Sequence, residues 1–381
     1  MRVLVPHLTA LLLLAACNPS VEEPAPLPAR DAPTSPDAPG PYAVGTTTHT
    51  FTDARGVELT VEIWYPALPD ADAEPSDYGQ LSLARDAYRD AAPDLRDEPF
   101  PLVAFSHGYG GIRYQSTFLT EHLASHGFVV VAPDHPHNTL FDLDADLTDQ
   151  VALARPGDIT AAVDEVARLA VDDARFAELV DAAQFAMVGH SFGGWTTLAV
   201  SGGLVDLDAT TAHCEEEPTA SCRFLDLSGS PDTSSTQPDP RVATMVSLAP
   251  GGAYTFAAGS LHSAPSPMVI GGGLDGDMPY DTEIRPAFDA LGPGATMVTY
   301  ARSGHWAFTD LCDLLDVLED CQGEPEGYME PLAIQQLTNT LVTAHLQRHL
   351  LATSAATDVS DPWLSPSTWD AEDDVTLEVA P

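Results

Sequence analysis

Apolar residues recur along the chain in short runs that are separated by polar, glycine-rich and proline-rich stretches. Residues 46–52 and 57–66 are rich in Thr, Val and aromatic side chains, which predicts two strands joined by a short turn. Further runs are short and almost entirely apolar, which is typical of parallel strands that are buried on both faces. These runs are residues 101–107, 127–135, 185–190, 242–250, 267–273 and 295–301.

Helical patterns lie between the apolar runs. Residues 157–170 place Ile159, Val163, Val166 and Leu169 on one helical face. The other predicted helices are residues 115–127, 191–200, 284–292 and 332–351. The alternation of strands and helices predicts an α/β protein whose mostly parallel eight-stranded sheet is flanked by helices.

The pattern divides the chain into one folded domain with less regular ends. We expect the domain to span residues 42–355, with residues 356–381 as an acidic C-terminal tail. Residues 17–41 are rich in Pro and Ala and predict an extended tether. Residues 201–240 interrupt the alternation as a long insertion after a helix, which predicts either a lid or a stabilised surface loop.

The N-terminus has the pattern of a processing signal. Arg2 precedes an apolar stretch, 3–16, that is too short to span a bilayer. The ending "LAAC" resembles the bacterial lipobox, which implies a signal peptide of residues 1–16 and lipid attachment to Cys17. We therefore expect an extracytoplasmic protein that is anchored by lipid to a bacterial membrane, inner or outer. Ordinary secretion with cleavage near Ala16 is the alternative.

The charge of the chain limits its partners. The sequence has 15 basic residues, all of them Arg, against 57 acidic residues, and a formal net charge of -42. Such a polyanion repels nucleic acid, so we expect no nucleic-acid partner. The simplest explanation of the charge is an adaptation to solubility or salt.

Four cysteines remain once Cys17 is removed, and they form two close pairs in an exported chain. The spacing favours disulfides Cys214–Cys222 and Cys312–Cys321, although four cysteines allow three connectivities. Neither pair has the spacing of a zinc site, and His135 with His137 makes only a weak pair. We therefore expect no metal site.

One short motif carries candidate chemistry. In "MVGHSFGGWTTL", Ser191 lies between Gly189 and Gly193, after a predicted strand and before a predicted helix. This strand–turn–helix context is that of a nucleophile elbow, in which a strained turn exposes the serine hydroxyl. A serine needs a base to take its proton, so the motif alone is not sufficient.

An acid and a base follow Ser191 in the required order. His305 lies after the last predicted strand, and Asp275 follows the strand 267–273. The order Ser, Asp, His is that of an α/β-hydrolase triad. Asp277 is a competitor for the acid, and we favour Asp275 because it is closer to the end of its strand.

Two backbone N–H groups are expected to hold the oxyanion. Phe192 follows the nucleophile, and Tyr109 lies in the glycine-rich loop "SHGYGG" after the strand 101–107. Trp306 is a candidate for the substrate pocket because it directly follows His305 and aromatic pocket linings are common. His135 is a second candidate, because its segment leaves a strand on the catalytic edge of the sheet.

Together, "PLVAFSHGYGG", "LASHGFVVVAPDH", "GHSFGG", the "SGH" of 303–305 and the "WYP" of 64–66 resemble one group of α/β-hydrolases. The group comprises relatives of platelet-activating-factor acetylhydrolase, dienelactone-hydrolase-like proteins and bacterial polyester hydrolases. The resemblance spans roughly residues 45–350 and implies hydrolysis of carboxylic esters without a cofactor. It also implies that Ser191, Asp275 and His305 form the triad, with Tyr109 and Phe192 as the oxyanion hole.

The sequence thus predicts an exported, membrane-tethered serine esterase that acts on short-chain, medium-chain or lipid-derived esters through an acyl-enzyme. Two alternatives stay open: a surface binding protein on the same fold without activity, and an amidase or peptidase that uses the same triad. The oligomeric state is not predicted.

Overall fold

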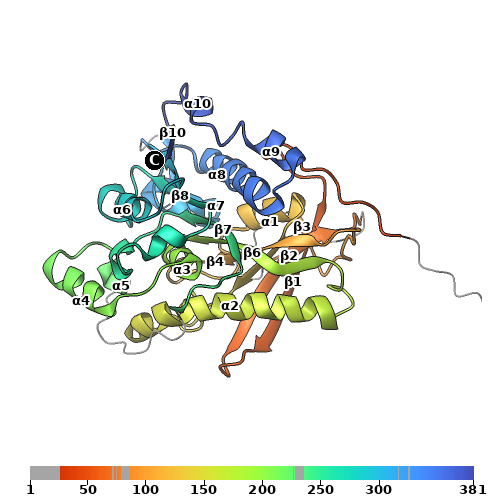
Figure 1. The fold of residues 1–381 in the computed structure, drawn as a ribbon, viewed down its shortest axis with the longest axis horizontal. Coiled ribbons are helices and arrows are strands. Elements are labelled where there is room, and N and C mark those ends of the chain that lie inside the picture. The colour runs from red at the N-terminus through yellow and green to blue at the C-terminus, as the bar shows by residue number, and fades with distance from the viewer. Residues whose placement is uncertain are drawn as a thin grey trace, which may run out of the picture.

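The computed structural model describes residues 26–70, 73, 75–78, 86–225, 227, 236–315, 317–324 and 327–381. Within this part of the chain a sheet of ten strands runs through the molecule, in the order β10-β9-β8-β7-β6-β4-β5-β2-β1-β3 (Figure 1). The strands are β1 (Ala43–Thr52), β2 (Glu58–Ala67), β3 (Ala87–Arg89), β4 (Phe100–Ser106), β5 (Val129–Pro133), β6 (Val180–His190), β7 (Val242–Leu248), β8 (Pro267–Gly272), β9 (Thr296–Tyr300) and β10 (Val375–Val379).

The centre of the sheet is parallel, as the buried apolar runs predict. Strands β5, β4, β6, β7, β8 and β9 pair in parallel, whereas β2 pairs antiparallel with β5 and with β1. The prediction of eight strands was too low, because β3 and β10 are additional strands at the two edges. β3 is too short to give a periodic signal, and the alternation of β10 lies within a strongly acidic segment.

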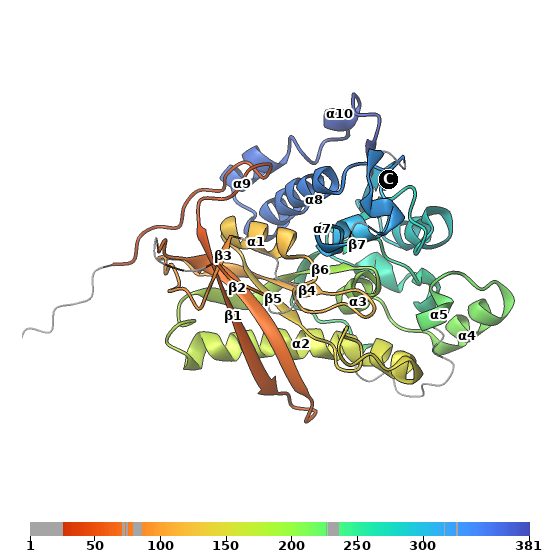
Figure 2. The ribbon, with the colours of Figure 1, turned by 180° about the vertical axis from the view of Figure 1, so that it is seen from behind.

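Helices cover both faces of the sheet, with α1 and α8 on one face and α2 and α3 on the other (Figures 1 and 2). The helices are α1 (Thr117–Ser125), α2 (Thr148–Asp172), α3 (Phe192–Ser201), α4 (Leu207–Glu216), α5 (Cys222–Leu225), α6 (Arg285–Asp289), α7 (Leu311–Leu314), α8 (Pro331–Leu346), α9 (Ser354–Ser360) and α10 (Pro366–Trp369). The architecture is an α/β-hydrolase fold, as the sequence predicts.

Helix α2 is longer than its pattern suggests. It begins at Thr148 rather than Gly157, and Pro156 lies inside it. A proline and a glycine side by side usually mark the boundary of a helix, so the pattern predicted a later start. The residues on either side, Arg155 and Asp158, are buried and hydrogen-bonded, and this tertiary packing explains why the helix continues through the proline.

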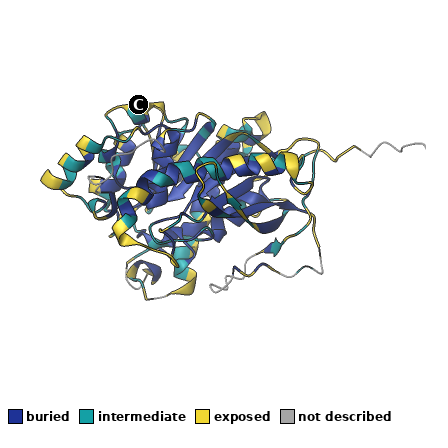
Figure 3. Ribbon diagram, turned by 90° about the horizontal axis from the view of Figure 1, so that it is seen from below, coloured by how far each residue is buried: buried dark blue, intermediate teal, exposed yellow. Residues whose placement is uncertain are grey.

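The sheet forms the core of the molecule. Central strands are buried along their length, whereas exposed residues lie on the outer sides of the helices and in the loops (Figure 3). Side chains without solvent exposure include Leu102, Val130, Val188, Val246 and Ile270, one from each of five neighbouring strands. The burial of both sheet faces is the reason why these strands read as continuous apolar runs.

Both ends of the described chain pack against the domain. In the expected tether, residues 26–41 bond to the domain: Arg30 donates to the Pro99 carbonyl, and His122 and His126 donate to the carbonyls of Pro36 and Ala38. In the expected acidic tail, residues 356–381 contain β10, which extends the sheet. The predicted signal peptide 1–16 and the lipidation site Cys17 lie outside the described residues.

Both predicted disulfides are confirmed: Cys214 is bonded to Cys222, and Cys312 to Cys321. The first pair lies in the insertion, which contains α4 and α5 rather than a loop alone. Among the described residues, no helix is long and apolar enough to cross a bilayer. The same residues contain no cluster of three or more His, Cys, Asp or Glu side chains arranged as metal ligands.

Candidate active site

Ser191 occupies a strained turn between β6 and α3. Its backbone has φ 58° and ψ −116°, a conformation that non-glycine residues rarely adopt. The neighbouring glycines are required, because a Cβ at Gly189 would clash with the Gly193 carbonyl and one at Gly193 with the Ser106 carbonyl. The turn holds the serine at the N-terminus of α3, where the helix dipole favours negative charge. This is the geometry of a nucleophile elbow.

The structure brings Ser191, His305 and Asp275 together although they lie far apart in the sequence. The Ser191 hydroxyl is 2.9 Å from His305 Nε2, and His305 Nδ1 is 2.7 Å from Asp275 Oδ2. All three residues are buried, with exposed fractions of 6%, 4% and 5% respectively. The Nδ1–H of a neutral His305 donates to the carboxylate, so Nε2 can accept the serine proton.

Asp275 rather than Asp277 faces the imidazole. The second carboxylate oxygen of Asp275 accepts the backbone N–H groups of Asp277 at 2.9 Å and Met278 at 2.7 Å, which fixes its orientation. Asp277 instead forms an ion pair with Arg223, at 3.0 Å. The strand-end argument from the sequence therefore selects the carboxylate that reaches the histidine.

Burial and charge act in opposite directions on His305. Burial alone disfavours the imidazolium, but the Asp275 carboxylate and its hydrogen bond outweigh burial and raise the pKa of His305 above its usual value. The negative charges of Asp277 and Asp320 raise this pKa further. An imidazolium formed when His305 takes a proton is therefore stabilised in place.

The two predicted oxyanion donors lie beside Ser191. Phe192 is the first residue of α3, so its N–H has no acceptor within the helix. Tyr109 lies in the loop after β4, and its ring centroid is 6.1 Å from that of Phe192. The adjacent Gly108 N–H donates to the side chain of Gln115 at 2.9 Å, which fixes this loop next to the elbow.

Gln115 and His190 form a link that the sequence analysis did not find. The Gln115 amide donates to His190 Nδ1 at 3.2 Å, and His190 Nε2–H donates to the His305 carbonyl at 3.1 Å. Burial and the nearby His305 hold the pKa of His190 well below its usual range, so His190 is neutral. The position of His190 directly before the nucleophile was the only signal in the sequence.

Asp320 also holds the loop that carries His305 in place. Its carboxylate accepts the backbone N–H of Trp306 at 2.7 Å, and Trp306 directly follows His305. Asp320 is buried and precedes Cys321, which is bonded to Cys312. The sequence around Asp320 has no pattern that predicts this contact.

A cavity of about 600 Å³ opens onto Ser191 and His305. Its walls are mostly apolar, and the polar groups in it include Gln115, Arg223 and Asp277. The apolar lining residues are Tyr109, Ile112, Tyr114, Leu140, Phe224, Trp306, Leu311 and Leu314. Trp306 thus lies where the sequence predicts it, in the wall of the pocket beside His305.

His135 does not line this cavity, contrary to the prediction. It is fully buried, with Nδ1 2.9 Å from Asp158 and Nε2 2.9 Å from the Ser106 hydroxyl. Its strand ends at the catalytic edge, but the buried Asp158 on α2 binds the ring and holds it inside the protein. Burial keeps the pKa of His135 far below its usual range, and the positive charge of Arg155 lowers it further.

Arg155 connects the two segments that carry the expected oxyanion donors, the Tyr109 loop and the start of α3. Its guanidinium donates to the His107 carbonyl and to Thr196 Oγ1, and it lies 4.5 Å from the Phe192 ring centroid. The first contact supports the Tyr109 loop, and the other two support the start of α3. This fully buried cation belongs to the support of the site and does not line the cavity.

The molecule has an α/β-hydrolase fold, and Ser191, His305 and Asp275 lie in it in the arrangement of a candidate Ser-His-Asp triad. The sequence model of the chlorophyllase family matches residues 91–214, a segment that contains Ser191 and ends before Asp275 and His305. The chain is 34% identical to cutinase est1 of Thermobifida alba over 110 residues, which is 29% of this chain and 33% of that relative. It is 34% identical to cutinase 2 of Thermobifida cellulosilytica over 112 residues, 29% of this chain and 37% of that relative.

The matched segment spans about one third of the length of these cutinases. A wider likeness exists in three dimensions, to a solved structure of a ferulic acid esterase from Streptomyces cinnamoneus. The TM-score is 0.60 with 21% sequence identity, over 89% of this chain and 98% of that chain. This likeness concerns the fold.

Proposed function

We propose that the protein is a serine-type carboxylic ester hydrolase. The observation that carries the proposal is the chain of hydrogen bonds from Ser191 through His305 to Asp275 at the base of an apolar cavity. The partial similarity to proteins named as cutinases supports the same reaction class.

In the first half of the reaction, Ser191 Oγ attacks the ester carbonyl while His305 Nε2 takes the hydroxyl proton. The carbonyl oxygen becomes an oxyanion that accepts hydrogen bonds from the backbone N–H groups of Phe192 and Tyr109. Asp275 stabilises the imidazolium without taking its proton. His305 then donates this proton to the leaving alcohol, and an acyl-serine remains.

In the second half, water enters and His305 takes one of its protons as the oxygen attacks the acyl carbon. The same N–H groups hold the second oxyanion. When it collapses, the bond to Ser191 Oγ breaks, His305 returns the proton to the serine, and the acid leaves. No metal or redox cofactor takes part in these steps.

The cavity favours uncharged esters with an apolar part. Its walls are mostly aromatic and aliphatic, and its cation, Arg223, is already paired with Asp277. A chain with a net charge of -42 also disfavours the approach of anionic substrates. Short-chain and medium-chain acyl esters and lipid-derived esters meet these requirements.

Replacement of Ser191 by Ala tests the proposal. The variant is expected to lose p-nitrophenyl butyrate hydrolysis by about 10⁴-fold or more and to fold normally, because only the nucleophile is removed. A fluorophosphonate probe should label the wild type and not this variant. Ser201→Ala, at the far end of α3, is the matched control and should keep both the ester hydrolysis and the labelling by the probe. Undiminished hydrolysis by the Ser191 variant would refute the assignment.

We further propose that the protein is exported and carries lipid on Cys17. The "LAAC" sequence supports this placement, and so does the presence of two disulfides, because disulfides persist mainly in oxidising compartments outside the cytoplasm.

A further inference from the structure

The insertion between α3 and β7 reaches the candidate active site through its short helix α5. In Figure 1, α4 and α5 lie at the side of the molecule beyond α3. Two successive residues of α5, Arg223 and Phe224, line the cavity that contains Ser191. We call these two residues the α5 wall.

Phe224 is the apolar part of the α5 wall. Its ring centroid is 5.7 Å from that of Tyr109, with the rings stacked, and 5.5 Å from that of Phe192. Only 8% of the residue is exposed. Because Tyr109 and Phe192 are the expected oxyanion residues, an ester held there has Phe224 among its nearest apolar neighbours.

Arg223 ties the α5 wall to the loop that carries the triad acid. Its guanidinium donates to the Asp277 carboxylate at 3.0 Å and to the Asp277 carbonyl at 3.3 Å. It also lies 5.3 Å from the Phe224 ring centroid. The ion pair therefore connects the insertion to the segment two residues beyond Asp275.

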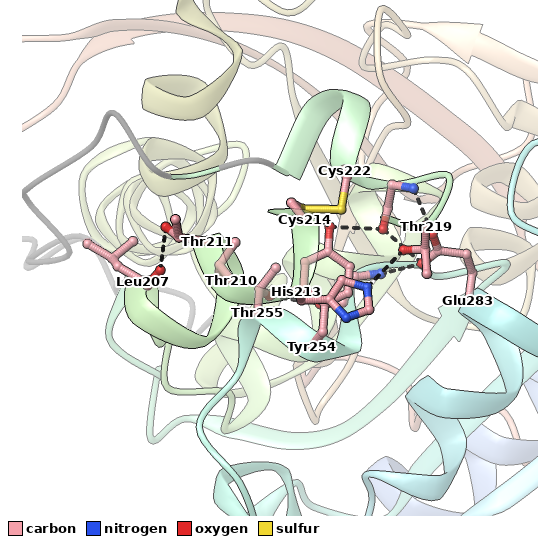
Figure 4. The surroundings of a disulfide bond; sticks show 12 residues. Leu207, Thr210, Thr211, His213, Cys214, Thr219, Cys222, Tyr254, Thr255 and Glu283 are labelled. Atoms are coloured by element: carbon pink, nitrogen blue, oxygen red, sulfur yellow. Dashed lines mark hydrogen bonds between the residues drawn. A yellow bond between two sulfur atoms is a disulfide. The ribbon is translucent and has the colours of Figure 1, made fainter. Parts of the chain in front are cut away.

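The rest of the insertion fixes α5 in place (Figure 4). The Cys214–Cys222 disulfide joins the end of α4 to the start of α5, and the rings of His213 and Tyr254 stack at 3.9 Å. Glu283, which is buried, accepts the backbone N–H of Ser221 at 2.6 Å and its hydroxyl at 2.8 Å. These contacts anchor both sides of the disulfide to the body of the domain.

We propose that the α5 wall determines which esters the cavity accepts, with Phe224 limiting the bulk of the acyl group and Arg223 holding the wall against the acid loop. This proposal rests on the proposed ester hydrolysis. It assigns the insertion the role of a fixed specificity element, in which the disulfide and Glu283 keep Phe224 beside the reacting carbonyl.

Two substitutions test the wall with p-nitrophenyl acetate and p-nitrophenyl octanoate, which share a leaving group. Phe224→Ala opens space beside the carbonyl, so kcat/KM for octanoate relative to acetate should rise by about tenfold, the scale of discrimination that a hydrophobic pocket achieves. Arg223→Gln loosens the wall and should change the ratio in the same direction by a smaller factor.

Arg175 provides a matched control for Arg223. It also lies over a phenylalanine ring, at 5.5 Å from Phe176, and pairs with an aspartate at 3.1 Å, but it does not line the cavity. Its side chain is 53% exposed, against 55% for Arg223. Arg175→Gln should leave the octanoate-to-acetate ratio unchanged.

The outcomes separate this proposal from the proposed function. If the wild type hydrolyses acetate but the ratio stays constant in Phe224→Ala and Arg223→Gln, or both esters lose rate equally, the wall proposal is overturned and ester hydrolysis stands. If Ser191→Ala retains full activity, the reaction assignment itself fails. Thermal unfolding checks that each variant folds, and Phe224→Leu, with a smaller expected rise, replaces the alanine variant if that one does not.

Discussion

At the scale of single residues, Asp277 influences the candidate triad without joining it. Its carboxylate is paired with Arg223, and its negative charge raises the pKa of His305. A base that must be neutral to accept a proton loses activity as the pH falls through its pKa. The acid limb of kcat/KM therefore depends on charges around His305 as well as on Asp275.

Asp277→Asn should move this acid limb to lower pH. Removal of the negative charge destabilises the imidazolium and lowers the pKa of His305, so the neutral base persists further into acid. The positive charge of Arg223, which then has lost its Asp277 partner, also lowers the pKa of His305. A pH profile of kcat/KM for p-nitrophenyl acetate measures the shift.

The control for this prediction is Asp281→Asn, which removes the same charge from an exposed position nearby in the sequence. It should leave the limb in place. A limb that stays fixed or moves to higher pH in Asp277→Asn would contradict the charge argument.

The sequence could predict which residues form the candidate triad but not the residues that hold them in place. Ser191, Asp275 and His305 could be predicted from a motif and from chain order, because in this fold the nucleophile, the acid and the base follow the ends of different strands in that order, here β6, β8 and β9. Gln115, His190 and Asp320 act through side-chain hydrogen bonds to segments that lie elsewhere in the sequence. One of these contacts joins residues 115 positions apart, and no periodicity or spacing encodes it.

At the scale of elements, the two disulfides close loops of similar length around different parts of the site. Cys214 and Cys222 are 8 positions apart and hold the α5 wall. Cys312 and Cys321 are 9 positions apart and close the loop that carries Asp320, which binds the backbone next to His305. Loss of either bond should therefore have similar effects on stability and different effects on activity.

Replacement of both cysteines of either pair by Ser should lower the free energy of unfolding by about 2.5 kcal/mol, the loop-closure value for a loop of this length. Without Cys312–Cys321, kcat should fall by about tenfold or more for every ester, because slight misplacement of a catalytic group is enough. Without Cys214–Cys222, the octanoate-to-acetate ratio should rise instead.

Urea unfolding together with the ester assays measures these effects. The opposite assignment, with a changed ratio in the Cys312/Cys321 variant and a uniform loss in the Cys214/Cys222 variant, would contradict the division of roles.

Element boundaries were predictable where both faces of a strand are buried, and less so elsewhere. Strand β10 alternates Val, Thr, Leu, Glu and Val, with Val375 and Leu377 buried, but its acidic surroundings favoured a tail. Residues 26–41 pack partly through backbone carbonyls, such as that of Pro36, which every residue has whatever its side chain. Composition cannot report such contacts.

At the scale of the whole molecule, the N-terminal segment and the cavity lie at opposite ends of the strands. The cavity is built from loops that follow β4, β6 and β9. Residues 28–30 instead bond to Asp97 and Pro99, directly before β4 begins. The chain therefore approaches the domain from the edge remote from Ser191.

Cys17→Ser should release the protein from membranes. If Cys17 is acylated, the wild type should sediment with the membrane fraction and incorporate an alkyne-tagged fatty acid, because acyl chains bind the bilayer by about 0.8 kcal/mol per methylene. The variant should do neither and keep its esterase activity once folded. Equal labelling of the two proteins would contradict attachment at Cys17.

The docking of residues 26–41 would also set the reach and direction of a lipid-anchored enzyme. A fully free segment from residue 17 to residue 42 would extend to about 90 Å, whereas the stretch from 17 to 26 extends to about 30 Å at most. If Cys17 carries lipid, a domain held so closely by the edge opposite its cavity would turn the opening of the cavity away from the membrane. Its substrates would then arrive from the surrounding medium rather than from the bilayer that carries it.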